Sequence, residues 1–292
     1  MGYYRFRSHD LLPVEQCPIS SPLINRAITA TWELGRTGII SAALREIEFF
    51  ADHRDEALLI EASCTRGIPS SDAHQIAEQL SHLLPDVQGA AIFEQPEPNQ
   101  FAGPKRIAGF GKPGIQYLVA GGPYRVSAGS FFQVNRFLIA ELADVVCKDA
   151  KGECALDLYA GIGLFSAVLA RSFAQVIAVE ASQTSHADLR HNCGQEVKAV
   201  LATTEQYLQQ VSSDLRPDLV VADPPRGGLG ENVIRNFARL DAARLTYVSC
   251  DPATLARDLR MLLGLGFKIK GAHLFDLFPQ TYHIESVFHL AR

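Results

Sequence analysis

Apolar and polar positions alternate in blocks along the second half of the chain. From residue 154 onward, short apolar runs are followed by segments with helical spacing, and this cycle repeats several times. The pattern predicts strand–helix units, which assemble into a parallel sheet with helices on both faces. The predicted strands are 155–159, 176–179, 197–201, 219–222 and 245–248, and the predicted helices are 166–171, 185–192, 232–240 and 253–263. Two closing strands, 268–275 and 283–290, have no helix signal between them and predict an antiparallel pair at the sheet edge.

The first part of the chain lacks this alternation. Its pattern predicts strands at 43–50, 57–62, 87–93 and 116–120 and one amphipathic helix at 70–84. We therefore expect two domains, a smaller α+β domain on an antiparallel sheet over 1–126 and an α/β domain over 127–292. A short strand at 124–127 and a helix at 136–147 lead into the second domain.

Composition and charge narrow the class of protein. The chain has 292 residues, 47% of them hydrophobic, so it can bury a sizeable core. Its net charge of -5 leaves no basic footprint, so charge alone gives no support for a nucleic-acid partner. Six cysteines without a closely spaced pair predict neither a zinc site nor a disulfide framework. We expect a cytoplasmic protein with free thiols, no metal and no membrane partner.

The loop after strand 219–222 carries the first candidate chemistry. Asp223 is placed at the carboxyl end of a buried strand, where open α/β sheets bind ligands. Pro224 and Pro225 stiffen the turn, and Arg226 puts a cation beside the carboxylate. The same residues are also compatible with an ordinary strand-to-helix turn.

A glycine turn follows the first strand of the second half. The run 157–165 leads from a strand through Gly161 and Gly163 into a helix, so a ligand can approach the backbone at the helix N-terminus. Ser166 stands where a dinucleotide fingerprint has its third glycine, which argues against a pyrophosphate cofactor. Glu180 ends the next strand and is placed to accept hydrogen bonds from a ribose. Together these positions predict a nucleotide-like ligand.

Three further positions are candidates for catalysis or binding. Cys250 lies between a strand and a helix N-terminus, which lowers the pKa of a thiol, but buried cysteines are also often inert. His283 and Glu285 are expected on one face of the last strand, either as a polar edge or as an acid–base group beside the thiol. Gln133 and Asn135 either bind the polar end of a ligand or cap the following helix.

Taken together, these motifs resemble the RNA uracil-C5 methyltransferase family, whose members make 5-methyluridine in transfer and ribosomal RNA. The resemblance covers residues 124–292 and is carried by six segments, 130–135, 157–165, 179–180, 223–227, 247–258 and 276–285. It is more specific in combination than in any one segment. The first part of the chain is less strongly similar to the central β-rich domain of the family. The resemblance implies a Rossmann-like class I methyltransferase domain.

The resemblance also implies a cofactor and roles for single residues. The cofactor is S-adenosylmethionine, and the substrate is a uridine in rRNA or tRNA. Cys250 is the expected nucleophile and Glu285 the base that removes the C5 proton. The expected cofactor-binding residues are Gln133, Tyr159, Gly161, Gly163, Glu180 and Asp223.

The chain departs from the family in two respects. Many members hold an iron–sulfur cluster with four cysteines, but only Cys17 fits that set here, so we expect no cluster. The oligonucleotide-binding barrel often found at the family's N-terminus is also missing, and the chain starts as though it were N-terminally truncated. Two alternatives therefore stay open: methylation of another substrate, and a non-catalytic module that binds S-adenosylmethionine or RNA.

Overall fold

The computed structural model describes residues 2–5, 8, 10–38, 40–94, 105–212 and 215–292. The chain forms two compact units. The first contains residues 1–118 and 126–129, and the second contains residues 119–125 and 130–292. The chain passes from one unit to the other within strands β7 (Gly114–Val119) and β8 (Gly122–Ser127), which form a two-stranded sheet.

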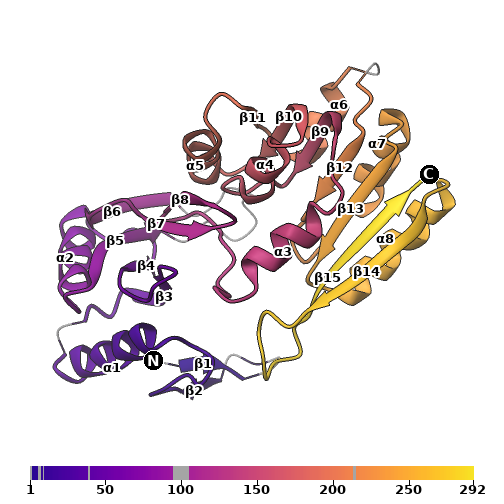
Figure 1. The fold of residues 1–292 in the computed structure, drawn as a ribbon. Coiled ribbons are helices and arrows are strands. Elements are labelled where there is room, and N and C mark those ends of the chain that lie inside the picture. Colours follow the sequence, from indigo (N-terminus) through magenta and orange to yellow (C-terminus); the bar gives the residue numbers. More distant parts are fainter. Residues whose placement is uncertain (1, 6–7, 9, 39, 95–104, 213–214) are drawn as a thin grey trace. The chain divides into compact units, whose positions relative to one another are not determined.

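A seven-stranded sheet forms the centre of the second unit (Figure 1). Its strand order is β11-β10-β9-β12-β13-β15-β14. The first five strands in this order are parallel, and β15 is antiparallel to both of its neighbours. The strands are β9 (Gly152–Leu158), β10 (Phe173–Glu180), β11 (Val197–Leu201), β12 (Leu219–Ala222), β13 (Arg244–Ser249), β14 (Lys268–Phe275) and β15 (Glu285–Ala291). The predicted parallel sheet with an antiparallel edge pair is therefore confirmed.

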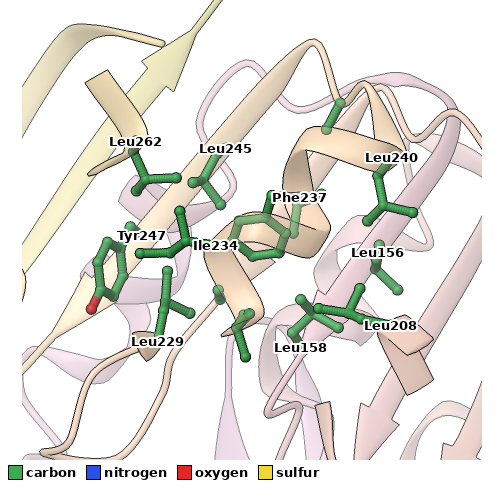
Figure 2. Packing of buried hydrophobic residues seen from close by; sticks show 14 of the residues in the cluster. Leu156, Leu158, Leu208, Leu229, Ile234, Phe237, Leu240, Leu245, Tyr247 and Leu262 are labelled. Atoms are coloured by element: carbon green, nitrogen blue, oxygen red, sulfur yellow. The ribbon is translucent and has the colours of Figure 1, made fainter. Parts of the chain in front are cut away.

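The helices between these strands form two groups. One group contains α3 (Ile139–Val146), α4 (Leu164–Leu169) and α5 (Gln183–Cys193), and the other contains α6 (Thr204–Gln210), α7 (Gly230–Leu240) and α8 (Pro252–Gly264). Leu156 and Leu158 of β9 pack with side chains of the second group, among them Phe237 (Figure 2). Burial of each such side chain contributes about 1.5–3 kcal/mol to folding. Through this core, one face of the sheet packs against α6, α7 and α8, which holds the strands in place.

Side-chain caps fix where several helices begin. Ser182, Thr203 and Asp251 each accept a hydrogen bond from a backbone N–H in the first turn of α5, α6 and α8. Thr203 and Gln206 form a reciprocal capping box. Helix α6 was not predicted from the sequence, although the spacing of Thr203 and Gln206 is typical of a helix start.

The first unit contains a four-stranded sheet in the order β3-β4-β5-β6. Its elements are β3 (Leu44–Ala51), β4 (Leu58–Cys64), α2 (Ser70–Ser81), β5 (Val87–Glu94) and β6 (Lys105–Gly111). The expectation of a purely antiparallel sheet is wrong at one pairing, because β4 and β5 are parallel. The reason is that α2 connects them as a crossover helix, which returns the chain to the edge where β4 began.

The first unit also contains elements that periodicity did not predict. Helix α1 (Pro22–Arg36) begins at Ser21, whose side chain caps it, and buries Leu23, Ala27, Ile28 and Thr31. Two of these four residues are Ala and Thr, so the apolar stripe is weak in sequence. Strands β1 (Gly2–Tyr4) and β2 (Leu11–Pro13) form a small antiparallel sheet. None of the helices in the described part of the chain is both long and apolar enough to cross a membrane.

Candidate active site at the ends of the sheet strands

The strand order of the large sheet reverses between β9 and β12. Strands β10 and β11 lie on one side of this point and β13 on the other. Leu158 and Ala222 are paired in parallel at the ends of β9 and β12, so Tyr159 and Asp223 leave the sheet side by side. The backbone N–H of Asp223 donates to the carbonyl of Leu158 at 3.4 Å. Open α/β sheets bind ligands at such a reversal, outside the carboxyl ends of the strands.

The glycine turn after β9 is held by Glu180. One carboxylate oxygen of Glu180 accepts the N–H of Gly161 at 2.8 Å, and the other accepts the N–H of Ser182 at 2.7 Å. Each oxygen has a second lone pair, so hydrogen bonds to a ligand remain available. Tyr159 has a positive φ of 62°, an uncommon conformation for a residue with a side chain. Glu180 and the positive φ of Tyr159 therefore constrain the turn, which lies at the carboxyl end of a central strand, a position suited to ligand binding.

Gly163 can only be a glycine in this turn. Its φ is +93°, and a Cβ there would lie 2.6 Å from Leu189 Cδ1 and 2.7 Å from Cys193 Sγ. At Gly161, which also has a positive φ, an added Cβ would meet only the Phe131 carbonyl oxygen at 4.0 Å. The first glycine therefore leaves room outside the turn, whereas the second brings the turn against α5.

Helix α5 also holds the segment that leads to Gln133. Asp188 is fully buried and accepts hydrogen bonds from Arg125 Nε at 2.5 Å and Ser130 Oγ at 2.8 Å. One turn later, Asn192 Nδ2 lies 3.0 Å from the carbonyl oxygens of both Arg125 and Ile162. One face of α5 thus joins the glycine turn to the segment that precedes Gln133.

Asp157 is a buried carboxyl group beneath the glycine turn. Ser166 donates to its Oδ2 at 2.5 Å, and its Oδ1 has no hydrogen-bond partner among the described residues. Desolvation by burial raises its pKa from 3.8 to about 7, and the hydrogen bond from Ser166 opposes this shift. A buried acceptor without a donor costs free energy, so this oxygen is a candidate for contact with a ligand.

Strand register brings Cys250 and Glu285 together. Ser249 at the end of β13 pairs with Ser286 of β15 in antiparallel fashion, so Cys250 directly follows this pair along β13 and Glu285 directly precedes it along β15. The two side chains are close enough for the charge of Glu285 to act on the Cys250 thiol. Glu285 is 6% exposed, and its Oε1 has no hydrogen-bond partner among the described residues.

The charges around Cys250 are mostly acidic. Burial raises the pKa of Glu285 to about 8, with a further contribution from Asp223, and burial raises the pKa of Asp223 to about 7. The pKa of Cys250 is raised by burial and by the nearby Glu285 and Asp223, whereas Arg226 lowers it. The four residues therefore form one electrostatic cluster, which we call the strand-end cluster.

The expectation that the helix N-terminus lowers the pKa of Cys250 is wrong. Helix α8 has its own anionic cap, because Asp251 Oδ1 accepts the N–H of Thr254 at 2.8 Å. The positive end of the helix dipole is therefore offset by a side chain, and two carboxyl groups act on the thiol from the sheet. Arg226 and a backbone hydrogen bond favour the thiolate, but they do not offset burial and the two carboxyl groups.

Arg226 contacts His283, which lies outside the last strand. His283 and Glu285 were predicted on one strand, but β15 begins at Glu285. His283 instead sits in the preceding connection, where its Nε2 is 3.4 Å from Arg226 Nη2. The connection between β14 and β15 is thus linked to the loop after β12.

The loop after β12 is fixed to the body of the domain by Asp258 of α8. This buried carboxylate accepts the N–H of Leu229 at 2.7 Å, the Tyr247 hydroxyl at 2.8 Å and Arg257 Nε at 2.9 Å. Arg257 Nη2 also donates to the carbonyl of Gly227 at 2.8 Å. We call these residues the Asp258 anchor, because they hold the loop that carries Arg226 at two positions after Arg226.

Gln133 and Asn135 differ in their roles. Asn135 Oδ1 accepts the N–H groups of Phe137 and Leu138, and its amide donates to the Leu277 carbonyl at 2.9 Å. Asn135 therefore holds the turn that leads into α3, whose N-cap residue is Leu138 and has no side-chain cap hydrogen bond. Gln133 is half-buried two residues earlier.

Most of the predicted site residues lie at one end of the sheet, where the parallel strands have their carboxyl ends. Tyr159, Gly161, Glu180, Asp223 and Cys250 follow the carboxyl ends of parallel strands or terminate them, and Glu285 begins the antiparallel neighbour. The side chain of Tyr159 packs partly against the apolar core, while its backbone forms the turn.

Two important carboxyl groups were not singled out from the sequence. Asp157 stands within a buried strand, and Asp258 stands on the buried face of α8 with Leu255 and Leu262. An acidic residue in an apolar pattern was the available signal in both cases, because buried carboxylates need partners or a function.

Comparison with known proteins agrees with this arrangement. The family model for tRNA (uracil-5-)-methyltransferases matches residues 120–292. RNA methyltransferases described as uncharacterized from Synechocystis sp. and Gloeobacter violaceus are each 32% identical to this chain. The matches cover 97% and 100% of the chain, and the chain spans 64% and 66% of the two relatives.

Solved structures share the fold. The tRNA (uracil-54, C5)-methyltransferase of Pyrococcus abyssi, in complex with S-adenosyl-L-homocysteine, has a TM-score of 0.75 and 24% identity. That match covers 99% of this chain and 72% of the other. A tRNA m1G37 methyltransferase from M. jannaschii has a TM-score of 0.53, 13% identity, and coverage of 90% and 78%. On the family match, this chain belongs to the tRNA (uracil-5-)-methyltransferase family.

Proposed function

We propose that the protein is an S-adenosylmethionine-dependent RNA methyltransferase that methylates C5 of a uridine in tRNA or rRNA. The observation that carries this proposal is the proximity of Cys250, which follows β13, to Glu285, which begins the paired strand β15. Family membership supports the reaction class.

The residues of the glycine turn fit an S-adenosylmethionine site. The open space over Gly161 admits a ligand near the backbone, and Glu180 can accept hydrogen bonds from ribose hydroxyls. The unpartnered oxygen of Asp157 lies beneath the same turn and can accept from an ammonium group. The proposed S-adenosylmethionine site also includes Gln133, Tyr159 and Asp223. When bound, the cofactor supplies an electrophilic methyl group on a sulfonium.

Methylation of uracil at C5 requires a nucleophile and a base, and Cys250 and Glu285 can supply them. Uracil C5 is too weak a nucleophile to take a methyl group directly. The Cys250 thiolate forms a bond to C6, and the electron pair of the C5–C6 double bond moves toward C5 and O4. C5 would then bond to the methyl carbon while the carbon–sulfur bond of the sulfonium breaks, and S-adenosylhomocysteine would leave as the thioether. Arg226 is the cation of the strand-end cluster and is placed to offset the charge that develops on the base.

Glu285 completes the reaction in this proposal. Its carboxylate takes the proton from C5, the double bond re-forms, and the bond from Cys250 to C6 breaks. A base that is paired and stacked inside a helix cannot reach Cys250 and Glu285, so the uridine must leave its stack. The raised pKa of Glu285, about 8, means that the basic form increases as pH rises through that value. Methylation should therefore become faster from pH 6 to pH 9.

Tritium release from RNA labelled at uracil C5 tests the proposal. The wild-type protein should release tritium only with S-adenosylmethionine present, and Cys250→Ala should abolish release. Cys64→Ala is the matched control, because Cys64 is a buried free thiol in β4 of the first unit and takes no part in the proposed site. A Cys250→Ala protein with full release would rule out the covalent mechanism. Methyl transfer to RNA without tritium release would indicate another target atom.

Binding of S-adenosylhomocysteine separates the remaining alternatives. A protein that binds this product in calorimetry but transfers no methyl group to tRNA or rRNA would fit the non-catalytic module. A protein that methylates small amines but not RNA would fit the other-substrate alternative. The proposed function requires both cofactor binding and RNA methylation in the same preparation.

A further inference from the structure

Arg226 is the cation of the strand-end cluster, and its charge acts on neighbouring groups without being paired to a carboxylate. The pKa of Asp251 is lowered by the hydrogen bond from the Thr254 N–H and also by the charge of Arg226. The cluster itself contains two further carboxyl groups. In the described part of the chain, however, the guanidinium forms no ion pair, and its hydrogen-bond contact is with Nε2 of His283 at 3.4 Å.

This contact assigns the position of the ring proton of His283. A guanidinium has donors and no acceptor, so Arg226 can donate to Nε2 only when this nitrogen carries no proton. The proton then lies on Nδ1, and the imidazole is neutral. A neutral acceptor orients the guanidinium and leaves its charge available to other groups, whereas a carboxylate in the same place would offset that charge.

The ring of His283 is held by its own segment, the connection between β14 and β15. Thr281 Oγ1 accepts the N–H of His283 at 3.2 Å and donates to the Phe278 carbonyl at 2.7 Å. The centre of the Tyr282 ring lies 4.2 Å from that of His283, and the centre of the Phe278 ring lies 6.1 Å away. Figure 1 shows this connection, drawn in yellow, extending beyond the ends of both strands. The imidazole is therefore fixed in a short turn that ends directly before Glu285.

The backbone around Arg226 is fixed from another element, helix α8. Thr254 Oγ1 donates to the Arg226 carbonyl at 3.1 Å, and Arg257 Nη2 donates to the Gly227 carbonyl at 2.8 Å. These bonds hold the main chain, but they do not hold the end of the long Arg226 side chain, whose ordering costs rotamer entropy. The contact with His283 is the one that fixes the guanidinium in the described part of the chain.

We propose that His283 is a positioning residue whose Nε2 holds the Arg226 guanidinium beside the Cys250 thiol and the target base. This inference rests on the proposed function, in which Cys250 is the nucleophile, and adds the residue that places its cation. Burial and the two carboxyl groups of the cluster raise the pKa of the Cys250 thiol, whereas Arg226 lowers it. A guanidinium that moves away therefore leaves less thiolate and less stabilisation of charge on the base. His283 thus acts through Arg226.

The pH profile of Cys250 alkylation tests the proposal without requiring the methylation reaction. Iodoacetamide reacts with the thiolate, and peptide mass spectrometry follows Cys250 separately from the other thiols. Arg226→Ala should move the profile to higher pH by about one unit, and His283→Ala should move it by about half a unit to one unit. His283→Gln should keep the wild-type profile, because the glutamine oxygen reaches the position of Nε2. His283→Asn should behave as the alanine variant does, because its oxygen lies nearer the backbone.

A double variant separates positioning from a general structural role. In an Arg226→Ala background, His283→Ala should shift the profile no further, because the group through which His283 acts is gone. His191→Ala is the matched control, since His191 is an exposed histidine of α5, and it should leave the profile unchanged. Binding of S-adenosylhomocysteine checks that each variant is folded, and the glutamine and asparagine variants decide the question if the alanine variant is not.

Three results would overturn the proposal. The first is an alkylation profile that does not move in His283→Ala or in Arg226→Ala. The second is a further shift when His283→Ala is added to Arg226→Ala, which would show that His283 acts by another route. The third is a profile in His283→Asn that matches the wild type as closely as the profile in His283→Gln.

Methylation kinetics distinguish this proposal from the proposed function. His283→Ala should lower kcat by about tenfold to a hundredfold and leave the KM for S-adenosylmethionine unchanged, because Arg226 acts on the thiol and the base. If wild type releases tritium and His283→Ala matches it in rate and in alkylation, the positioning role is wrong and the function stands. If the alkylation profiles shift as expected while wild type releases no tritium, the positioning role stands and the C5 reaction fails.

Discussion

The Asp258 anchor and the strand-end cluster both contain buried carboxyl groups, but they differ in hydrogen bonding. Asp258 accepts from a backbone N–H, a tyrosine hydroxyl and a guanidinium. Glu285 is also buried, yet its Oε1 has no partner among the described residues, and its pKa is raised to about 8. The two regions meet at the loop after β12, which carries Asp223 and Arg226 and whose Gly227 carbonyl accepts from Arg257.

This difference distinguishes structural from reactive carboxyl groups. Donors around a carboxylate replace the water it has lost, so an anchor such as Asp258 stabilises the fold. A carboxyl group buried without donors holds its proton more strongly and can exchange it near neutral pH. The hydrogen bonds of Asp258 thus fix the loop, whereas Glu285 and Asp157 are buried and each keeps a carboxyl oxygen without a hydrogen-bond partner among the described residues.

The largest expected effect comes from Glu285→Gln. This change keeps the size of the side chain but removes the base, so methylation should fall by about a hundredfold to ten-thousandfold. Single-turnover assays with S-adenosylmethionine and RNA measure the rate, and the covalent RNA–Cys250 species should accumulate on denaturing gels. Unchanged turnover would show that another group removes the C5 proton. Stability at pH 8 should not fall, in contrast to the anchor.

Asp258→Asn should destabilise the protein by roughly 3 kcal/mol, because the amide presents N–H groups where donors already converge. Urea unfolding at pH 8 measures this loss. Asp241→Asn is the control, since Asp241 is exposed and its ion pair with Arg292 lies at the surface. That change should cost less than about 1 kcal/mol. Equal effects of the two changes would remove the distinction between the anchor and a surface carboxylate.

Asp157→Asn should alter how stability depends on pH. The pKa of Asp157 is about 7 in the folded protein, raised from 3.8 by burial. The folded state therefore keeps a proton that the unfolded chain loses, and stability falls as pH rises from about 4 to about 7, by up to about 1.4 kcal/mol per pH unit. The variant lacks this titration, so its unfolding free energy should be flatter and higher than that of wild type at pH 8. A loss at pH 8 like that of Asp258→Asn would contradict the comparison.

The smallest expected effect separates two glycines of one turn. Gly163→Ala should cost about 1–3 kcal/mol, since the new Cβ collides with Leu189 and Cys193 at a positive φ. Gly161→Ala should cost about 1 kcal/mol, from the positive φ alone. Thermal unfolding measures both. Binding of S-adenosylhomocysteine should nevertheless weaken more in Gly161→Ala relative to its stability loss, because that position faces the proposed ligand.

Local pattern was a good guide to the elements of the second unit. The strands Val197–Leu201, Leu219–Ala222 and Lys268–Phe275 have the predicted limits, because each is a run bounded by turn residues. Helices α1 and α6 were not predicted from the sequence, because α1 buries small residues and α6 is short. In the first unit, the pattern predicted strands but not the parallel pairing of β4 and β5, which depends on where a crossover helix returns the chain.

The candidate site was predicted from the sequence in its residue types, and its assembly was decided by tertiary structure. The sequence determined that Asp223 and Cys250 follow apolar strands and that Gly161 and Gly163 form a turn, because these are local properties of a few neighbouring residues. Strand order and register decided that β12 lies beside β9 and that Glu285, at the start of β15, lies near the end of β13, which Cys250 follows. The buried environment then raised the pKa of the thiol that the sequence predicted to be lowered, since desolvation and neighbouring charges depend on residues far apart in the chain.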